Sequence, residues 1–333
     1  MKNTKIIMGL IAIFVILAAS GCGPQKQQIE VRVHEGTEGL KMSFIEKSPP
    51  DEAYEGERMQ LVVELRNKGA YDIEYNQGLL VLGIEREYVS APDEFVQNPI
   101  MFSLTGRSLY DPIGGFDRKT IPLTVKTLGP QIETLTTNIA VTACYPYRTE
   151  AAAQVCVDSD IYGQREQEKV CTPQTLSMGT IQREGQELPR GQGAPIAVTK
   201  IEQKMLPHER DDMVKPSYMI YVKNMEDGLP VDIDTYDKAC AGIGMQKRTL
   251  NVVKANVFLT DRNAQMQLNC TPKVIEAGKA GYIKLEDKED FIKCTYEEGI
   301  LKAMGTYTTP LIIDLDYGYT FTISKSVLLR KYV

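Results

Sequence analysis

The sequence IDLDYGYTFTIS, residues 313–324, places apolar or aromatic residues at odd positions and polar residues or glycine at even positions. A period of two puts the odd side chains on one face of an extended strand and the even side chains on the other. The stretch therefore predicts a long, half-buried strand or a bent pair of strands. Gly318 is the expected position of a bend or bulge.

The same period recurs along most of the chain. Strands are expected at residues 40–46, 59–67, 78–84, 100–104, 119–127, 135–145, 154–158, 194–202, 217–224, 250–260, 265–270, 281–286, 291–296, 308–324 and 327–332. Turn-forming residues separate them at intervals of about ten residues, which is typical of β-sandwiches. No amphipathic helical stripe longer than the N-terminal apolar segment occurs, so the sequence predicts an all-β fold.

Composition limits the classes of function. The chain has 333 residues, of which 43% are hydrophobic and 25% charged, as in ordinary folded proteins. A net charge of −6 without a long basic run argues against a nucleic-acid partner, because phosphate binding needs clustered Lys and Arg. The chain has two histidines, His34 and His208, so a three-histidine zinc site is excluded. A Ser-His-Asp triad would have to use one of these two residues.

The N-terminus has the pattern of a secretory signal. Lys2 and Lys5 precede an apolar run over residues 6–19, and small residues lead to Cys22. The end of this segment resembles the lipobox of bacterial and archaeal lipoproteins, although Ala19 stands where that family prefers Leu. The resemblance implies that residues 1–21 are a signal peptide, that Cys22 is lipidated, and that residues 22–35 are a tether. An ordinary cleaved signal and an uncleaved helical anchor are the alternatives, and all three place the remaining chain outside the cytoplasm.

The other six cysteines form an even set, which suggests disulfides in an oxidising compartment: Cys144, Cys156, Cys171, Cys240, Cys270 and Cys294. A turn near Glu150 would place the first two opposite each other in one hairpin, and shared parity favours Cys270–Cys294. Elimination then pairs Cys171 with Cys240. The spacings match no common zinc motif, so no metal or cofactor is expected.

The two halves of the chain echo each other. MQLVVELRNKG at 59–69 and YMIYVKNMEDG at 218–228 are each a strand that ends in Asn, at Asn67 and Asn224, with a glycine nearby. This resembles the strand and Asn-x-Gly signature of archaeal and bacterial surface modules of immunoglobulin-like shape, including CARDB-like domains. The resemblance implies two tandem immunoglobulin-like sandwiches, at 36–160 and 194–333, joined by a linker with an edge strand at 161–193. It further implies an archaeal type of surface lipoprotein.

Tyrosine is unusually abundant, with 17 residues against 8 phenylalanines. Five of these tyrosines offer either an aromatic contact surface or core packing with a hydroxyl at the rim: Tyr145, Tyr147, Tyr162, Tyr218 and Tyr221. Both interpretations stay open at the level of sequence.

Two polar segments are candidate sites. The insert 227–248 interrupts the strand pattern, and its Asp232, Asp234 and Asp237 either offer carboxylates to a cation or form a solvated acidic loop. The run 208–212 places His208 beside carboxylates, but no nucleophile elbow accompanies it, and a solvated loop is expected. No catalytic residue is therefore predicted, and the insert is the candidate binding loop.

These observations predict a non-enzymatic protein anchored to the outer face of the cell membrane by an N-terminal lipid or helix. Its expected role is adhesion, envelope structure or the binding of a protein or glycan partner. One alternative is a substrate-binding lipoprotein of a transporter, which would require helix-rich α/β lobes. The other is a β-sandwich glycan hydrolase with a pair of carboxylates.

Overall fold

The computed structural model describes residues 33–163, 169–183, 186–240, 247–261, 264–273 and 278–332. The chain from Val33 onward forms one compact unit. Cys22 and the expected signal peptide lie outside the described residues. Among the residues that are described, no helix is long and apolar enough to cross a membrane.

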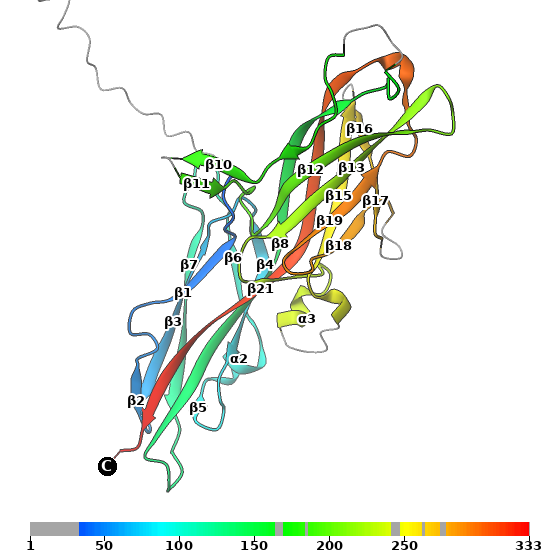
Figure 1. Ribbon diagram of the computed structural model, residues 1–333. Coiled ribbons are helices and arrows are strands. Elements are labelled where there is room, and N and C mark those ends of the chain that lie inside the picture. Colours follow the sequence, from blue (N-terminus) through cyan, green and yellow to red (C-terminus); the bar gives the residue numbers. More distant parts are fainter. Residues whose placement is uncertain are drawn as a thin grey trace, which may run out of the picture. The chain divides into compact units, whose positions relative to one another are not determined.

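In the described residues, three larger sheets and one two-stranded hairpin make up the fold (Figure 1), and their strands pair antiparallel except β2, which lies parallel to β21. The four-stranded sheet has the order β1 (Leu40–Phe44), β3 (Arg58–Asn67), β7 (Phe116–Val125), β5 (Val89–Ser90). The six-stranded sheet has the order β17 (Asn269–Thr271), β19 (Glu289–Thr295), β13 (Met213–Asn224), β12 (Ile196–Pro207), β9 (Leu176–Ser177), and β20 (Ile300–Leu301) also pairs with β13. β9 lies at the end of this strand order and within residues 161–193.

The nine-stranded sheet connects both parts of the molecule. Its order is β16 (Ala264–Gln267), β15 (Val252–Asp261), β21 (Tyr307–Arg330), β8 (Thr134–Val157), β4 (Ile73–Gly83), β6 (Ile100–Leu104), with β14 (Leu229–Val231), β18 (Gly281–Lys284) and β2 (Glu52–Tyr54) paired at its sides. The hairpin joins β10 (Thr180–Arg183) to β11 (Gln186–Pro189). The helical elements are α2 (Asp93–Gln97), α3 (Tyr236–Cys240), η1 (Lys247–Thr249) and η2 (Lys302–Met304).

β8 and β21 are each 24 residues long and pair along their whole length. The ladder runs from Tyr307 opposite Val157 to Arg330 opposite Thr134 without a register shift. β4 pairs with the N-terminal part of β8, and β15 pairs with the N-terminal part of β21. We therefore call β1–β7 the first half and β9–β20 the second half, with β8 and β21 shared between them (Figure 1).

The alternation expected at 313–324 is confirmed, because Ile313, Leu315, Tyr317 and Tyr319 are buried. The bulge expected at Gly318 is wrong, since the ladder has no register shift there. A side chain at this position would meet α3, because an added Cβ would lie 2.4 Å from Cβ of Tyr236. Gly318 therefore serves the close approach of this helix.

The turn expected near Glu150 is also wrong. Residues 135–145 and 154–158 were expected as two strands of a hairpin, but residues 134–157 form one continuous strand. Alternation alone does not distinguish these cases, because the side-chain period is the same in a hairpin and in a straight strand.

This difference changes two disulfides. Cys144 and Cys156 are twelve positions apart in one strand and therefore about 40 Å apart, since a strand rises about 3.3 Å per residue. Cys144 instead bonds Cys240 of α3, and Cys156 bonds Cys171. The expected pairs Cys144–Cys156 and Cys171–Cys240 are thus wrong.

The third pair, Cys270–Cys294, is confirmed. These two cysteines lie directly opposite each other on the adjacent strands β17 and β19, with 4.0 Å between their Cα atoms. Cross-strand neighbours share a face of the sheet, which is why their matching parity predicted the pair.

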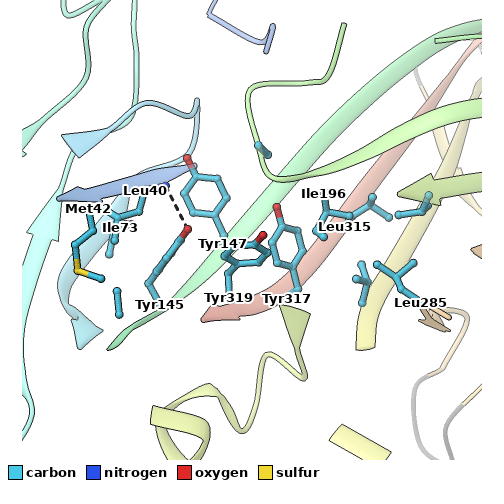
Figure 2. Packing of buried hydrophobic residues seen from close by; sticks show 14 of the residues in the cluster. Leu40, Met42, Ile73, Tyr145, Tyr147, Ile196, Leu285, Leu315, Tyr317 and Tyr319 are labelled. Atoms are coloured by element: carbon cyan, nitrogen blue, oxygen red, sulfur yellow. Dashed lines mark hydrogen bonds between the residues drawn. The ribbon is translucent and has the colours of Figure 1, made fainter. Parts of the chain in front are cut away.

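Four buried tyrosines, named here the tyrosine cluster, occupy the middle of the shared strands (Figure 2). They are Tyr145 and Tyr147 of β8, which lie opposite Tyr319 and Tyr317 of β21. Neighbouring ring centroids are 5.5–6.4 Å apart with tilted or edge-on planes, which is the favourable geometry for aromatic pairs. Figure 2 shows the rings between Leu40, Met42 and Ile73 of the first half and Ile196 and Leu285 of the second. The cluster therefore belongs to one core that continues through both halves.

The two Asn motifs hold equivalent positions beside this cluster. Asn67 Oδ1 accepts hydrogen bonds from the Tyr147 hydroxyl at 2.9 Å and from the backbone N–H two residues later at 3.2 Å. Asn224 Oδ1 accepts the corresponding bonds from the Tyr319 hydroxyl at 3.0 Å and from its own i+2 N–H at 3.2 Å. Each Nδ2 donates to the carbonyl four residues later at 2.7 Å. The repeated sequence motif thus forms the same set of hydrogen bonds twice, and we call each set an Asn–Tyr fixture.

Candidate functional site

A hollow of about 630 Å³ lies where both halves meet the shared strands, and we call it the junction hollow. β1 and the preceding residues 38 and 39 line it from the first half, and residues 226–229 line it from the second. Tyr145 of β8, Tyr319 of β21 and Ala239 of α3 also line it. The site is therefore assembled from segments that are far apart in the sequence.

Hydroxyl groups line one wall of the junction hollow. Thr142 of β8 and Thr322 of β21 are joined by a hydrogen bond of 2.8 Å between their Oγ1 atoms, and Thr320 lies next along β21. A hydroxyl can donate one hydrogen bond and accept two. This wall can therefore bind a partner that offers donors, acceptors or both.

Three carboxylates also line the junction hollow, those of Glu38, Glu226 and Asp227. Glu226 is half-buried, and its pKa is raised first by burial and then by the negative charges of Glu38 and Asp227. Lysines partly neutralise this group, because Lys68 lies 3.0 Å from Glu38 and Lys288 lies 2.9 Å from Asp227. Lys41 also lines the hollow, but three carboxylates outnumber this cation, so the lining suits a hydroxyl-rich or cationic group better than an anion.

α3 closes one edge of the hollow and is held in place covalently. Cys240 ends the helix and bonds Cys144 of β8, where both residues are buried. The insert 227–248 is the candidate contact loop predicted from the sequence, and its residues 227–229 and 239 line the hollow. Residues 241–246 of this insert lie outside the described residues.

The three aspartates of the insert have a different place. The Asp232 carboxylate accepts a hydrogen bond from the Asp234 N–H at 3.1 Å, and its backbone carbonyl accepts one from the Thr235 N–H at 3.0 Å. These contacts form the turn that leads into α3, while Asp234 and Asp237 are exposed. Within the described ranges, no group of three His, Cys, Asp or Glu side chains is arranged to hold a metal ion.

The charged run at 208–212 is a set of local contacts. His208 Nδ1 accepts the Arg210 N–H at 2.9 Å, and the His208 ring packs against Gly299. The Arg210 guanidinium lies 2.8 Å from the Asp212 carboxylate, and this hydrogen-bonded pair raises the pKa of Arg210 and lowers the pKa of Asp212, so both groups stay charged. His34 lines a separate hollow of about 600 Å³ beside Glu150 and Asp314.

The five tyrosines for which a contact surface and core packing stayed open divide between core and exterior. Tyr145, Tyr147 and Tyr218 are buried, Tyr221 is partly buried and Tyr162 is exposed. The sequence did not predict that Thr142, Thr322, Glu38 and Glu226 share one site. No local signal joins them, because each comes from a different segment and only the pairing of β8 with β21 brings the threonines together.

No protein-family model matches the chain, and no curated protein matches it. Among solved structures, a chain named BspA_C_WT aligns over 87% of this chain and 99% of its own length, with 7% sequence identity and a TM-score of 0.16. A likeness at that level carries no inference about function. The three disulfides indicate an extracytoplasmic protein, because such bonds persist in oxidising compartments.

Proposed function

We propose that this chain is a non-enzymatic protein anchored to the outer face of the cell membrane, where it binds a protein or glycan of the envelope. The number of cysteines is the observation that supports a membrane anchor. Six of the seven cysteines pair among themselves, so Cys22 is the one left over. Its place after the small residues of a signal segment favours lipidation.

Intact mass spectrometry of the protein from a lipidating, oxidising host tests the anchor. The expected mature chain begins at a diacylated Cys22, and each of its three disulfides takes up two hydrogens on reduction. The chain with Cys22→Ser is the matched control and should lack the lipid mass while keeping all three disulfides. A wild-type chain without lipid would contradict the proposal.

The junction hollow is the proposed recognition site. Its support is that both halves, both shared strands and the disulfide-held helix α3 supply its walls. Pockets that combine aromatic surface with a few placed polar groups are the usual form of a binding site. The mix of threonine hydroxyls and carboxylates favours a partner rich in hydroxyl or amine groups.

Capture of envelope components tests this assignment. The double change Thr142→Val and Thr322→Val removes both hydroxyls at nearly constant volume and should weaken capture about tenfold, as the loss of about 1.4 kcal/mol of hydrogen bonding requires. Thr136→Val, at an exposed position of β8 outside the hollow, is the matched control. Equal capture by the double variant and the control would contradict a role for the hollow.

A further inference from the structure

The loop between β6 and β7, residues 106–115, exposes large apolar side chains to solvent, and we call it the apolar loop. Leu109 is 72% exposed, Tyr110 is 99% exposed and Ile113 is 63% exposed. Single exposed apolar residues are ordinary, but three within five positions form a patch that marks an interaction surface.

Hydrogen bonds within the apolar loop hold this conformation. The Ser108 N–H donates to the Asp111 carbonyl at 2.8 Å, and the Ser108 Oγ accepts the Asp111 N–H at 2.9 Å. The Asp111 carboxylate also accepts the Gly114 N–H at 3.1 Å. The apolar side chains therefore project from a preformed loop, and binding through them would cost little ordering of the backbone.

Aromatic side chains continue the surface beside the loop, next to one arginine and the acidic residues Asp72 and Glu74. Tyr75 and Phe116, which are 82% and 48% exposed, line one hollow together with Thr105 and Gly115 at the two ends of the loop. The Arg66 guanidinium lies 4.9 Å from the centre of the Phe116 ring. Other charged side chains near Phe116 form ion pairs: Arg118 pairs with Glu64, and Lys119 Nζ lies 2.9 Å from the Asp117 carboxylate. Glu74, beside Tyr75, is exposed.

The base of the apolar loop also clamps the start of the described chain. Arg107 Nη2 donates a hydrogen bond to the Val33 carbonyl at 3.0 Å and a second one to the Glu35 carbonyl. Only residues 23–32 separate Val33 from Cys22, and a chain of that length spans at most about 40 Å even when fully extended. A lipid on Cys22 would thus limit the distance of Val33, and of Arg107 bonded to it, to about 40 Å from the membrane surface.

We infer that the apolar loop, with Tyr75 and Phe116, is a membrane-contact surface that inserts into the interface of the bilayer to which Cys22 is anchored. The inference rests on the proposed lipid anchor and adds the orientation of the folded unit on the membrane. Tyrosine and phenylalanine favour the headgroup region, leucine and isoleucine favour the acyl boundary, and Arg66 can approach anionic headgroups.

The chain contains no tryptophan, so one introduced tryptophan is an unambiguous fluorescent reporter. Tyr110→Trp places it at the tip of the loop. Tyr332→Trp is the matched control, because Tyr332 is 76% exposed and its ring contacts Tyr54, near the opposite end of β3. Asn67, at the loop end of β3, lies about 30 Å from Arg58 along this ten-residue strand.

Each full-length, lipidated chain is reconstituted into mixed phosphatidylcholine–phosphatidylglycerol vesicles with brominated acyl chains, and flotation and emission are measured together. Floating Tyr110→Trp chains should lose emission about twofold or more relative to unbrominated vesicles, while Tyr332→Trp chains keep theirs. Adding Leu109→Ser and Ile113→Ser to Tyr110→Trp should restore the emission.

The other outcomes overturn the inference in distinguishable ways. Flotation without quenching at position 110 refutes the membrane contact and leaves the lipid anchor standing. Equal quenching at both positions refutes a contact specific to the loop. Emission at position 110 that shifts with protein concentration in the absence of vesicles assigns the surface to a second copy of the chain. A chain that fails to float and carries no lipid refutes the anchor and, with it, the inference.

Discussion

The strands that belong only to the first half contain no cysteine, whereas those of the second half are closed by Cys270–Cys294, and the end of β8 on that side is closed by Cys156–Cys171. Both halves nevertheless use the same Asn–Tyr fixture against the shared strands. The first half therefore depends on noncovalent pairing with β21, which the distant C-terminal end of the chain supplies. The two halves thus share equivalent polar contacts but differ in the number of disulfides that stabilise them.

Separating the halves should have the largest effect. A fragment of residues 36–160 keeps β8 but loses its 24-residue partner β21. We expect it to lack a cooperative unfolding transition, because the buried face of β8 and its backbone groups are left without a neighbour. Circular dichroism during urea titration measures this, and mixing with the fragment 161–333 should restore the transition. Cooperative unfolding of 36–160 alone would contradict the dependence.

Alkaline pH should weaken the centre of the molecule next. Burial raises the pKa of each member of the tyrosine cluster above the ordinary value near 10. Above pH 10 the unfolded chain releases these protons while the folded chain retains them, so stability is full below pH 10 and falls as the pH rises. Each tyrosine removes about 1.4 kcal/mol per pH unit, or roughly 5 kcal/mol for the cluster at pH 11.

Matched double variants make the pH experiment a comparison of the shared strands. Tyr145→Phe with Tyr147→Phe should remove about half of the loss that the cluster causes, and Tyr317→Phe with Tyr319→Phe should remove the other half. Tyr218, whose pKa is also raised by burial, contributes equally in all variants. Urea unfolding at pH 8 and pH 11 measures the loss for each protein. An alkaline loss in either double variant equal to that of the wild type would exclude the cluster as its source.

The disulfides should differ in rank. Cys144 and Cys240 are 96 residues apart, and Cys270 and Cys294 are 24 residues apart. In the chain-entropy model, removing the longer loop costs about 4.7 kcal/mol of unfolding free energy and the shorter loop about 3.5 kcal/mol. Double Cys→Ser variants compared by urea unfolding test the order, and a larger loss for the 270–294 pair would contradict it.

The smallest expected difference lies between the two Asn fixtures. Asn67→Ala and Asn224→Ala should each cost about 2–3 kcal/mol, because each leaves a buried tyrosine hydroxyl and backbone groups unpaired. Asn67 should cost about 1 kcal/mol more, since its Nδ2 also bonds the Leu104 carbonyl at 3.3 Å. Thermal and urea unfolding of the pair measures the difference. Losses below about 0.5 kcal/mol for both would show that the fixtures do not stabilise the fold.

Parity explains which features the sequence could predict. The buried face of residues 313–324 and the Cys270–Cys294 bond both depend on which side of a strand a residue occupies, and alternation reports this directly. The length of β8 does not depend on parity. A turn at Glu150 and a continuous strand keep the same odd face buried, so two cysteine pairs were assigned wrongly.

The candidate site was predictable only in part. The insert 227–248 could be recognised because it breaks the strand period, and it does reach the junction hollow. Thr142 and Thr322 could not, because each is an ordinary polar residue of a strand until the two strands pair. The exposed loop tip at Leu109, Tyr110 and Ile113 likewise has no distinguishing local pattern, since similar apolar residues elsewhere are buried.

By itself, the sequence determined the all-β character, the inward face of the strands whose alternation is clear, the even set of cysteines and the repeated Asn motif, because each is a local pattern of side-chain chemistry. The tertiary structure alone decided that β8 and β21 run through both halves, which cysteines meet, and which threonines and carboxylates share a hollow. These features depend on contacts between segments far apart in the sequence: 96 residues separate Cys144 from Cys240, and 180 residues separate Thr142 from Thr322. Such pairing is selected by burial of the whole core, and no short stretch of sequence contains it.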